Sequence, residues 1–199
     1  MSYKQHHIIY IHGLGDYLLR NAIQKIVLQP WRLFGVRPHY HIIRWADQRS
    51  TFKEKLSVLL EHIDKLHKQG HTISLVGASA GASMALVALA KRPNKIHRVV
   101  CIAAKLRDIH TLHMTASYVI NPAYKDALEL FQKIESKFST NMRRRVLLIK
   151  PQTDRLVPVR DMYLQGAQIH QLSTNGHLVT IFLALTRYRR IILDFIKTN

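Results

Sequence analysis

The pentapeptide Gly77-Ala-Ser-Ala-Gly81 constrains the fold of this chain more than any other segment. It follows the apolar run Thr72–Val76, which is typical of a buried strand, and precedes the alanine-rich stretch Ala82–Ala90, which favours a helix. Two glycines at this spacing permit a sharp strand-to-helix turn that bulkier side chains would obstruct. Such a turn lifts the Ser79 hydroxyl above the end of the strand. A tight turn with a helix-capping serine is the alternative interpretation.

Strand-like and helix-like stretches alternate along the whole chain, without repeats or a Pro/Gly-rich linker. This alternation predicts one α/β domain over residues 1–199. We expect a three-layer α/β/α sandwich around a mostly parallel sheet of about six strands, with helices on both faces. The expected strands are His6–Ile11, His39–Arg44, His71–Val76, Arg98–Ala103, Arg145–Lys150 and Gln168–Leu172. The expected helices are Tyr17–Leu28, Phe52–Lys68, Ala80–Lys91, Ala123–Phe138 and Val179–Lys197.

The composition agrees with an ordinary globular protein, since 47% of the residues are apolar and 21% are charged. Every apolar stretch is shorter than the about 20 residues that a membrane-spanning helix needs. The pattern of a secretory signal is also missing from the N-terminal residues, so we expect a cytoplasmic protein. The single cysteine, Cys101, lies in an apolar run and is interpreted as a buried core residue rather than a nucleophile.

The charge is less ordinary, because 30 Lys and Arg residues face 12 Asp and Glu residues, for a net charge of +18. A field of this sign attracts nucleic acid, anionic lipid or acidic substrates, so each is a candidate partner. The basic residues are nevertheless scattered, and the densest runs are only Met142–Arg145 and Arg187–Arg190. A general basic bias of the host proteome is the other explanation, and the sequence leaves both open.

Two polar residues follow late strands at the edge of the sheet where Ser79 is expected. Asp154 comes just after the expected strand Arg145–Lys150, and His177 follows Gln168–Leu172. Ligands of parallel α/β sheets bind outside the carboxyl ends of the strands. His177 is therefore the candidate base for Ser79, with Asp154 holding the imidazole tautomer. Alternatively, Asp154 is a solvated loop carboxylate and His177 only a helix-start residue, and Asp108 is a competing acid.

These segments together resemble the α/β-hydrolase superfamily, and in particular its compact, lidless members. The matching pieces are His12-Gly13-Leu14-Gly15, Gly77–Gly81, Thr153–Pro158 and Gly176-His177, which span nearly the whole chain. The chain order Ser, Asp, His is also the order of that superfamily. Two departures are that Ala80 stands where many relatives carry a larger residue or Gln, and that about six strands replace the eight of the fuller fold.

The resemblance implies an oxyanion hole built from the backbone N–H groups of Ala80 and Leu14. Gly13 and Gly15 would allow the close backbone approach that such a donor needs. We expect His12 to shape this loop rather than to act as the base. Gly77 and Gly81 are the supporting glycines of the serine turn.

The function expected from these residues is that of a serine hydrolase, which cleaves a small carboxylic ester or thioester through an acyl-enzyme on Ser79. A serine peptidase of the same fold is one alternative. The other is a non-catalytic, hydrolase-like protein that binds an anionic partner through its basic surface. We expect no cofactor and no metal, because the pairs His110/His113 and His62/His67 have helical ligand spacing but no evident third ligand. Segments 109–114 and 118–120 are expected to form a small apolar lip over the site.

Overall fold

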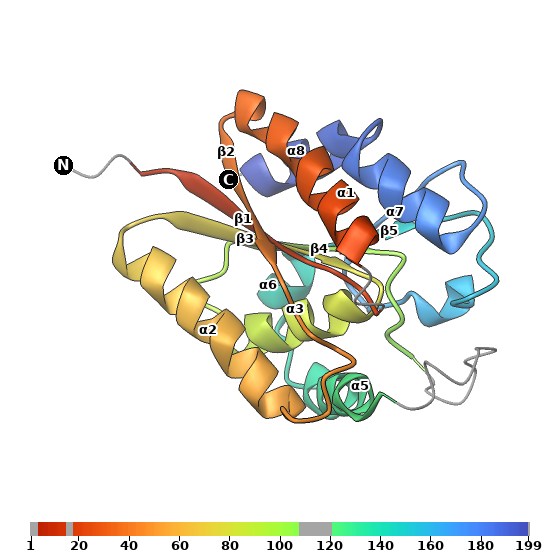
Figure 1. Cartoon of the computed structure of the whole chain (residues 1–199), viewed down its shortest axis with the longest axis horizontal. Coiled ribbons are helices and arrows are strands. Elements are labelled where there is room, and N and C mark those ends of the chain that lie inside the picture. Colours follow the sequence, from red (N-terminus) through yellow and green to blue (C-terminus); the bar gives the residue numbers. More distant parts are fainter. Residues whose placement is uncertain (1–3, 15–17, 108–120, 199) are drawn as a thin grey trace.

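Six parallel strands form the sheet on which the molecule is built (Figure 1). The structure is a computed structural model that describes residues 4–14, 18–107 and 121–198. The strand order is β2-β1-β3-β4-β5-β6. The strands are β1 (His6–Ile11), β2 (Val36–His41), β3 (Thr72–Ala78), β4 (Arg98–Ile102), β5 (Val146–Lys150) and β6 (Gln168–Gln171).

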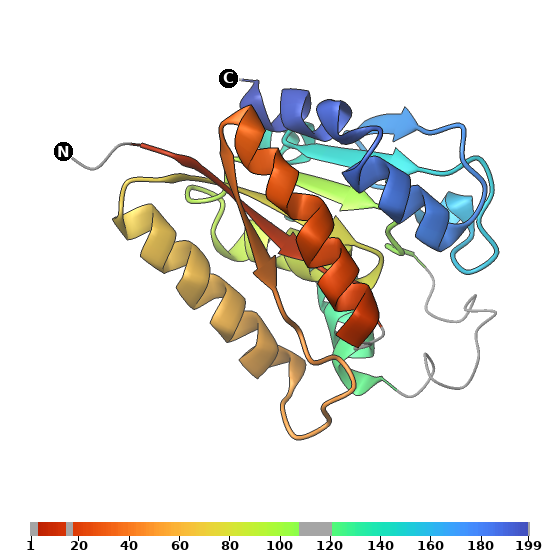
Figure 2. The same cartoon turned by 45° about the horizontal axis from the view of Figure 1, so that its top comes forward.

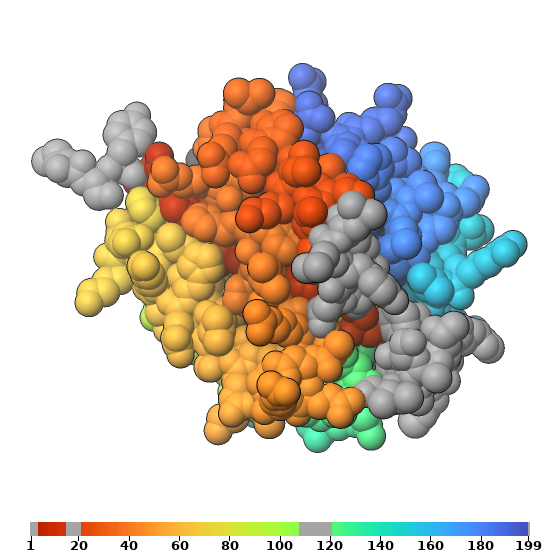
Figure 3. Space-filling model, viewed as in Figure 1, coloured from red at the N-terminus to blue at the C-terminus, as the bar shows by residue number. Residues whose placement is uncertain are grey.

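Helices cover both faces of this sheet, which confirms the predicted three-layer sandwich (Figures 1 and 2). On one face lie α2 (Phe52–Lys68), α3 (Ala80–Lys91) and α5 (Pro122–Glu135). On the other lie α1 (Leu18–Leu28), α7 (His177–Leu185) and α8 (Arg189–Lys197). Shorter helical segments are η1 (Gln29–Phe34), α6 (Thr140–Arg144) and η3 (Val159–Asp161). In the space-filling view, α1 and the blue C-terminal helices lie side by side on the same face (Figure 3).

The core is divided into two halves because successive strand residues point to opposite faces. Ile9 and Ile11 of β1 are fully buried on the α2, α3 and α5 side, whereas Ile8 and Tyr10 are fully buried on the α7 and α8 side. From Ala80 to Leu89, α3 is buried on every side. The central strands and α3 are thereby fixed by apolar packing, and they place the serine turn.

The chain leaves β1 in one direction to form β2, and then crosses back over β1 to form β3, β4, β5 and β6. The connections after β1 and β3 therefore depart to opposite faces of the sheet. In parallel α/β sheets, such a switch point opens a crevice at the carboxyl ends of the strands, where ligands bind. The segments carrying Gly13 and Ser79 flank this switch point.

Three predicted elements differ from the structure. The second strand is Val36–His41 rather than His39–Arg44. Proline is tolerated there because β2 lies at the edge of the sheet and Pro38 needs no N–H for a further neighbour. The long C-terminal helix is two helices, since α7 ends at Leu185 and α8 begins at Arg189. At the other edge, β6 is exposed along its whole length, so its expected burial was wrong.

Among the described helices, none is both long enough and apolar enough to cross a lipid bilayer. Cys101 is fully buried, as expected, and burial raises the pKa of its thiol. The expected lip, residues 109–114 and 118–120, lies outside the described residues, as do Asp108, His110 and His113.

Candidate functional site

Ser79 occupies a strained turn between β3 and α3. Its φ and ψ angles are 51° and −120°, a region that side chains other than glycine rarely adopt. The backbone N–H of Ser79 donates to the carbonyl of Ile102 at the end of β4, over 2.9 Å. This bond and the buried α3 hold the turn in place. Ser79 retains 8% of its surface exposed, at the carboxyl edge of the sheet.

The two glycines of the turn are needed because backbone lies directly against them. A Cβ atom on Gly77 would lie 2.6 Å from the Cα atom of Ala82. A Cβ atom on Gly81 would lie 2.7 Å from the carbonyl oxygen of His12, in the loop after β1. Gly81 therefore allows the start of α3 to pack against that loop.

The loop after β1 also approaches the serine itself. A Cβ atom on Gly13 would lie 2.8 Å from the Cβ atom of Ser79, which is too close for any other residue type. Leu14 follows in this loop and is nearly buried, while Ala80 is the first residue of α3. The first N–H groups of a helix lack intrahelical partners. Gly15 lies outside the described residues.

His12 is committed to the loop through both of its ring nitrogens. The Nδ1 atom lies 2.7 Å from the carbonyl oxygen of Gly13, and Nε2 accepts a bond of 3.0 Å from the N–H of Ile43. Because Nε2 accepts, the proton of the neutral ring resides on Nδ1. The carbonyl of His12 in turn accepts a bond from the Trp45 indole, at 3.2 Å. The ring joins the loop after β1 to the segment after β2.

Asp154 and His177 form a buried hydrogen-bonded pair. The His177 Nδ1 atom lies 2.7 Å from Asp154 Oδ2, and 4% and 0% of the two side chains are exposed, respectively. The second carboxylate oxygen, Oδ1, accepts the N–H groups of Leu156 at 2.8 Å and Val157 at 3.0 Å. Burial raises the pKa of the Asp154 carboxyl, but the hydrogen bonds and charge from His177, with those two N–H groups, outweigh it, and the pKa lies below its ordinary value.

A small parallel bridge joins the loop that carries Asp154 to the loop that carries His177. Thr153 and Asn175 pair in this bridge, and their side chains lie 2.8 Å apart, from Thr153 Oγ1 to Asn175 Oδ1. The N–H of Gly176 donates to the carbonyl of Thr153, at 2.8 Å, and that of Gln152 donates to Thr174, at 2.9 Å. The sequence gave no signal for this bridge, because both residues are ordinary in polar loops.

A buried ion pair supports the same region and was also missed by the sequence interpretation. Lys105 Nζ lies 2.9 Å from Asp161 Oδ2, with 1% and 6% of the two side chains exposed. The carbonyl of Lys105 accepts a bond from the Ser83 hydroxyl of α3. This contact connects the segment after β4 to η3, a few residues beyond Asp154. A lysine directly after a buried apolar strand was the available signal.

Ser79, Asp154 and His177 thus follow β3, β5 and β6, at one edge of the sheet. Within the described residues Asp154 is the hydrogen-bond partner of the His177 ring, and no hydrogen bond joins that ring to Ser79. His62 packs against the rings of His39 and His41. In residues 4–14, 18–107 and 121–198, no group of three His, Cys, Asp or Glu side chains is placed to hold a metal ion.

Comparison with known proteins finds likeness in structure only. A structure from the description of LipS and LipT, two metagenome-derived lipolytic enzymes, superposes with a TM-score of 0.69 at 15% identity, covering 98% of this chain and 95% of that chain. MGS-MChE2, an α/β-hydrolase enzyme from a metagenome of sediments of the Mar Chica lagoon in Morocco, gives 0.68 at 17%, covering 98% and 91%. Est1E from Butyrivibrio proteoclasticus, with ferulic acid bound, gives 0.65 at 15%, covering 96% and 90%.

No family model matches the sequence, and no curated protein matches it. Sequence identity at this level establishes a shared fold and leaves the reaction to be argued from the residues.

Proposed function

The fold is that of the α/β-hydrolases, and we propose that this chain uses it as a serine hydrolase of carboxylic esters or thioesters. The observation that carries the proposal is the 2.7 Å bond between His177 Nδ1 and the buried carboxylate of Asp154. With Nδ1 engaged, the base function falls to Nε2, the atom that takes the serine proton in such constellations. Ser79 is the nucleophile, His177 the general base and Asp154 the residue that orients it.

In the first step the Ser79 oxygen attacks the carbonyl carbon of the substrate while His177 takes the hydroxyl proton. The imidazolium that forms is stabilised by Asp154, whose lowered pKa keeps it ionised at neutral pH. The negative charge on the carbonyl oxygen is placed near the backbone N–H groups of Ala80 and Leu14 and the N-terminus of α3. When the intermediate collapses, His177 gives its proton to the leaving alcohol or thiol, and the acyl group remains on Ser79.

A water molecule completes the cycle by attacking the acyl carbon. His177 takes a proton from this water and returns it to the Ser79 oxygen, so the free serine and a carboxylic acid are produced. Hydrogen bonds between base and nucleophile are often long in free enzymes and tighten on substrate binding. The absence of a bond between His177 and Ser79 in the described structure therefore agrees with a resting enzyme.

Ester cleavage is favoured over peptide cleavage by what the structurally similar proteins are. They include lipolytic enzymes, an esterase with bound ferulic acid and a monoglyceride lipase from Saccharomyces cerevisiae. A serine peptidase would use the same three residues. The two activities are separated by comparing turnover of matched ester and anilide substrates.

The decisive test is covalent labelling with a fluorophosphonate probe, read by intact mass. We expect one adduct on the wild type and on Ser83→Ala, a matched control whose hydroxyl is buried in α3. The variant Ser79→Ala should carry none. An adduct that persists on Ser79→Ala, or a wild type that never reacts, would contradict the proposal.

A further inference from the structure

Two adjoining clefts lie at the amino ends of the strands, on the edge of the sheet opposite Ser79. One, of about 580 Å³, is lined by residues at the starts of β1 and β2, by η1 and by the end of α8. The other, of about 470 Å³, is lined by residues at the starts of β3, β4 and β5. Lys4 lines both. Together they pass beneath five neighbouring strands, a span of about 20 Å at the usual strand spacing.

The described residues that line these clefts are basic, and none of them is Asp or Glu. Four histidines, His6, His67, His71 and His97, are among them. The six Lys and Arg residues are Lys4, Arg32, Arg37, Lys95, Arg145 and Lys197.

Most of this charge is not neutralised by carboxylates. Arg145 donates to the carbonyls of Pro93 and Ile96, at 2.8 and 2.9 Å, and Lys197 donates to the carbonyl of Phe34, at 2.6 Å. Such bonds satisfy the N–H groups but leave the positive charge. The Arg145 Nε atom is in addition buried without a hydrogen-bond partner. Lys95 is the exception, because it pairs with Asp64 at 2.8 Å.

Helix geometry explains only part of this charge. Helices of an α/β sandwich end at the amino edge of the sheet, and basic residues are favoured in their last turns. Lys197 in α8 and Arg32 in η1 fit that explanation. Lys4 and Arg37 do not, because they lie before or within strands. Both are exposed and form no ion pair or side-chain hydrogen bond within the described residues.

We propose that this basic edge is a binding site for single-stranded nucleic acid. Its phosphates would lie along the clefts, against Lys4, Arg37 and Arg145, and its bases would stack on exposed or half-buried histidine rings. A membrane is a poorer match, since the charges line concave clefts that a lipid surface does not enter. The neutral rings of His67 and His71 supply the flat faces that bases require and lipid headgroups do not.

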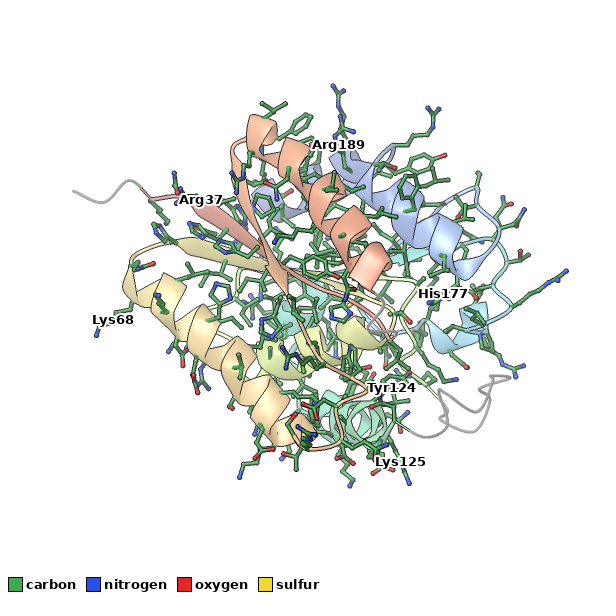
Figure 4. The ribbon with its side chains drawn as sticks, viewed as in Figure 1. Arg37, Lys68, Tyr124, Lys125, His177 and Arg189 are labelled. Carbon is green, nitrogen blue, oxygen red and sulfur yellow. The ribbon has the colours of Figure 1, made fainter. Side chains whose placement is uncertain are left out.

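The proposed site is independent of the proposed hydrolase chemistry. Figure 4 shows Arg37 at the end of the molecule where the chain begins, well away from His177. Nucleic acid bound at the amino edge therefore leaves the carboxyl edge of the sheet open. Loss of one activity need not remove the other, so the two proposals fail separately.

The test is fluorescence anisotropy with a labelled oligouridylate of about 12 nucleotides. For four neutralised phosphates, the affinity should fall about 50-fold between about 50 mM and about 200 mM salt. The double variant Lys4→Glu/Arg37→Glu should bind at least tenfold more weakly and lower the salt slope by about 1 for each residue. Ester turnover, where present, should be unchanged in this variant.

The matched control is Lys53→Glu/Lys133→Glu, which makes the same change in net charge at exposed positions on α2 and α5. It should keep most of the affinity. Equal weakening by both double variants would show that net charge alone attracts the oligonucleotide, and it would overturn the site. Binding to anionic phosphatidylserine vesicles with none to the oligonucleotide would overturn it as well, in favour of a membrane partner.

Discussion

Thr153 and Asn175 lie opposite each other in a parallel bridge, one residue before Asp154 and two residues before His177. The proposed acid and base are thus held at the same height by backbone pairing, in addition to their own hydrogen bond. The distance of 2.7 Å between the two side chains is a result of this arrangement of the loops.

Asn175→Ala removes the side-chain bond to Thr153 while leaving the backbone bridge. Because the pair is exposed and neutral, its net contribution is about 0.5–1.5 kcal/mol. We expect kcat for an activated ester to fall up to about tenfold, with little change in the midpoint of thermal unfolding. Thr153→Ser, which keeps the hydroxyl, should retain most of the activity. Unchanged kcat in Asn175→Ala would mean that the backbone bonds suffice.

Asp154→Asn should abolish most of the proposed activity without unfolding the protein. An amide in place of the carboxylate favours the wrong histidine tautomer, which lowers kcat by about 10⁴-fold in enzymes of this kind. Steady-state ester hydrolysis and circular dichroism together check this. Asp47→Asn, an exposed loop carboxylate after β2, is the control and should remain active. Comparable activity in both variants would assign the acid role elsewhere.

Gly13→Ala should reduce turnover because the new methyl group would lie 2.8 Å from the Cβ atom of Ser79. Either the loop or the serine must move, and displacement of a reacting group by about 1 Å can cost about a hundredfold in rate. Labelling by the fluorophosphonate probe should slow in parallel with ester turnover. If both rates match those of the wild type, the loop after β1 does not contribute to the site.

Asp161→Asn should destabilise the protein by about 3–5 kcal/mol, because it leaves the Lys105 charge buried without its carboxylate partner. Urea denaturation measures this change. The double variant Lys105→Met/Asp161→Leu removes both charges and should recover much of the loss. A single variant as stable as the wild type would show that water reaches Lys105.

Acid should destabilise the fold through histidines of β1 and β2. Burial, reinforced by neighbouring basic groups, lowers the pKa of each to about 4, and the four are His6, His7, His39 and His41. In the unfolded chain the pKa returns to about 6.5, so the unfolded state binds more protons below that pH. Stability should therefore be full above about pH 6.5 and fall as the pH drops toward about 4.

Urea midpoints across this pH range test the effect. His39→Gln removes the partner that lies 2.8 Å from His7 Nδ1, and its midpoint should depend less steeply on pH. A wild-type midpoint that stays constant from about pH 6.5 to about 4 would contradict the assignment.

The sequence predicted the parts of the fold that depend on local pattern. The helices Phe52–Lys68 and Ala80–Lys91 have the predicted bounds, since a Thr51 capping box starts the first and the glycine turn starts the second. It failed where the position in the sheet decides. Pro38 was excluded from a strand because its place at the edge could not be known.

The residues proposed for the site were selected from their places after strands, and the structure brings Asp154 and His177 into contact. Their supports could not be found in this way. Thr153 with Asn175, and Lys105 with Asp161, are pairs distant in sequence whose meeting depends on how loops from different strands are aligned. Single-residue patterns carry no record of such partners.

The complete burial of α3 has a consequence for how the protein would lose function on heating. Ser79 is attached to a segment that is released only when the whole core opens, whereas Asp154 and His177 sit on loops joined by a few exposed bonds. Local opening requires less free energy in such loops than in the core. The acid and base should therefore separate from the serine well below the global melting temperature, in a reversible loss that leaves the secondary structure intact.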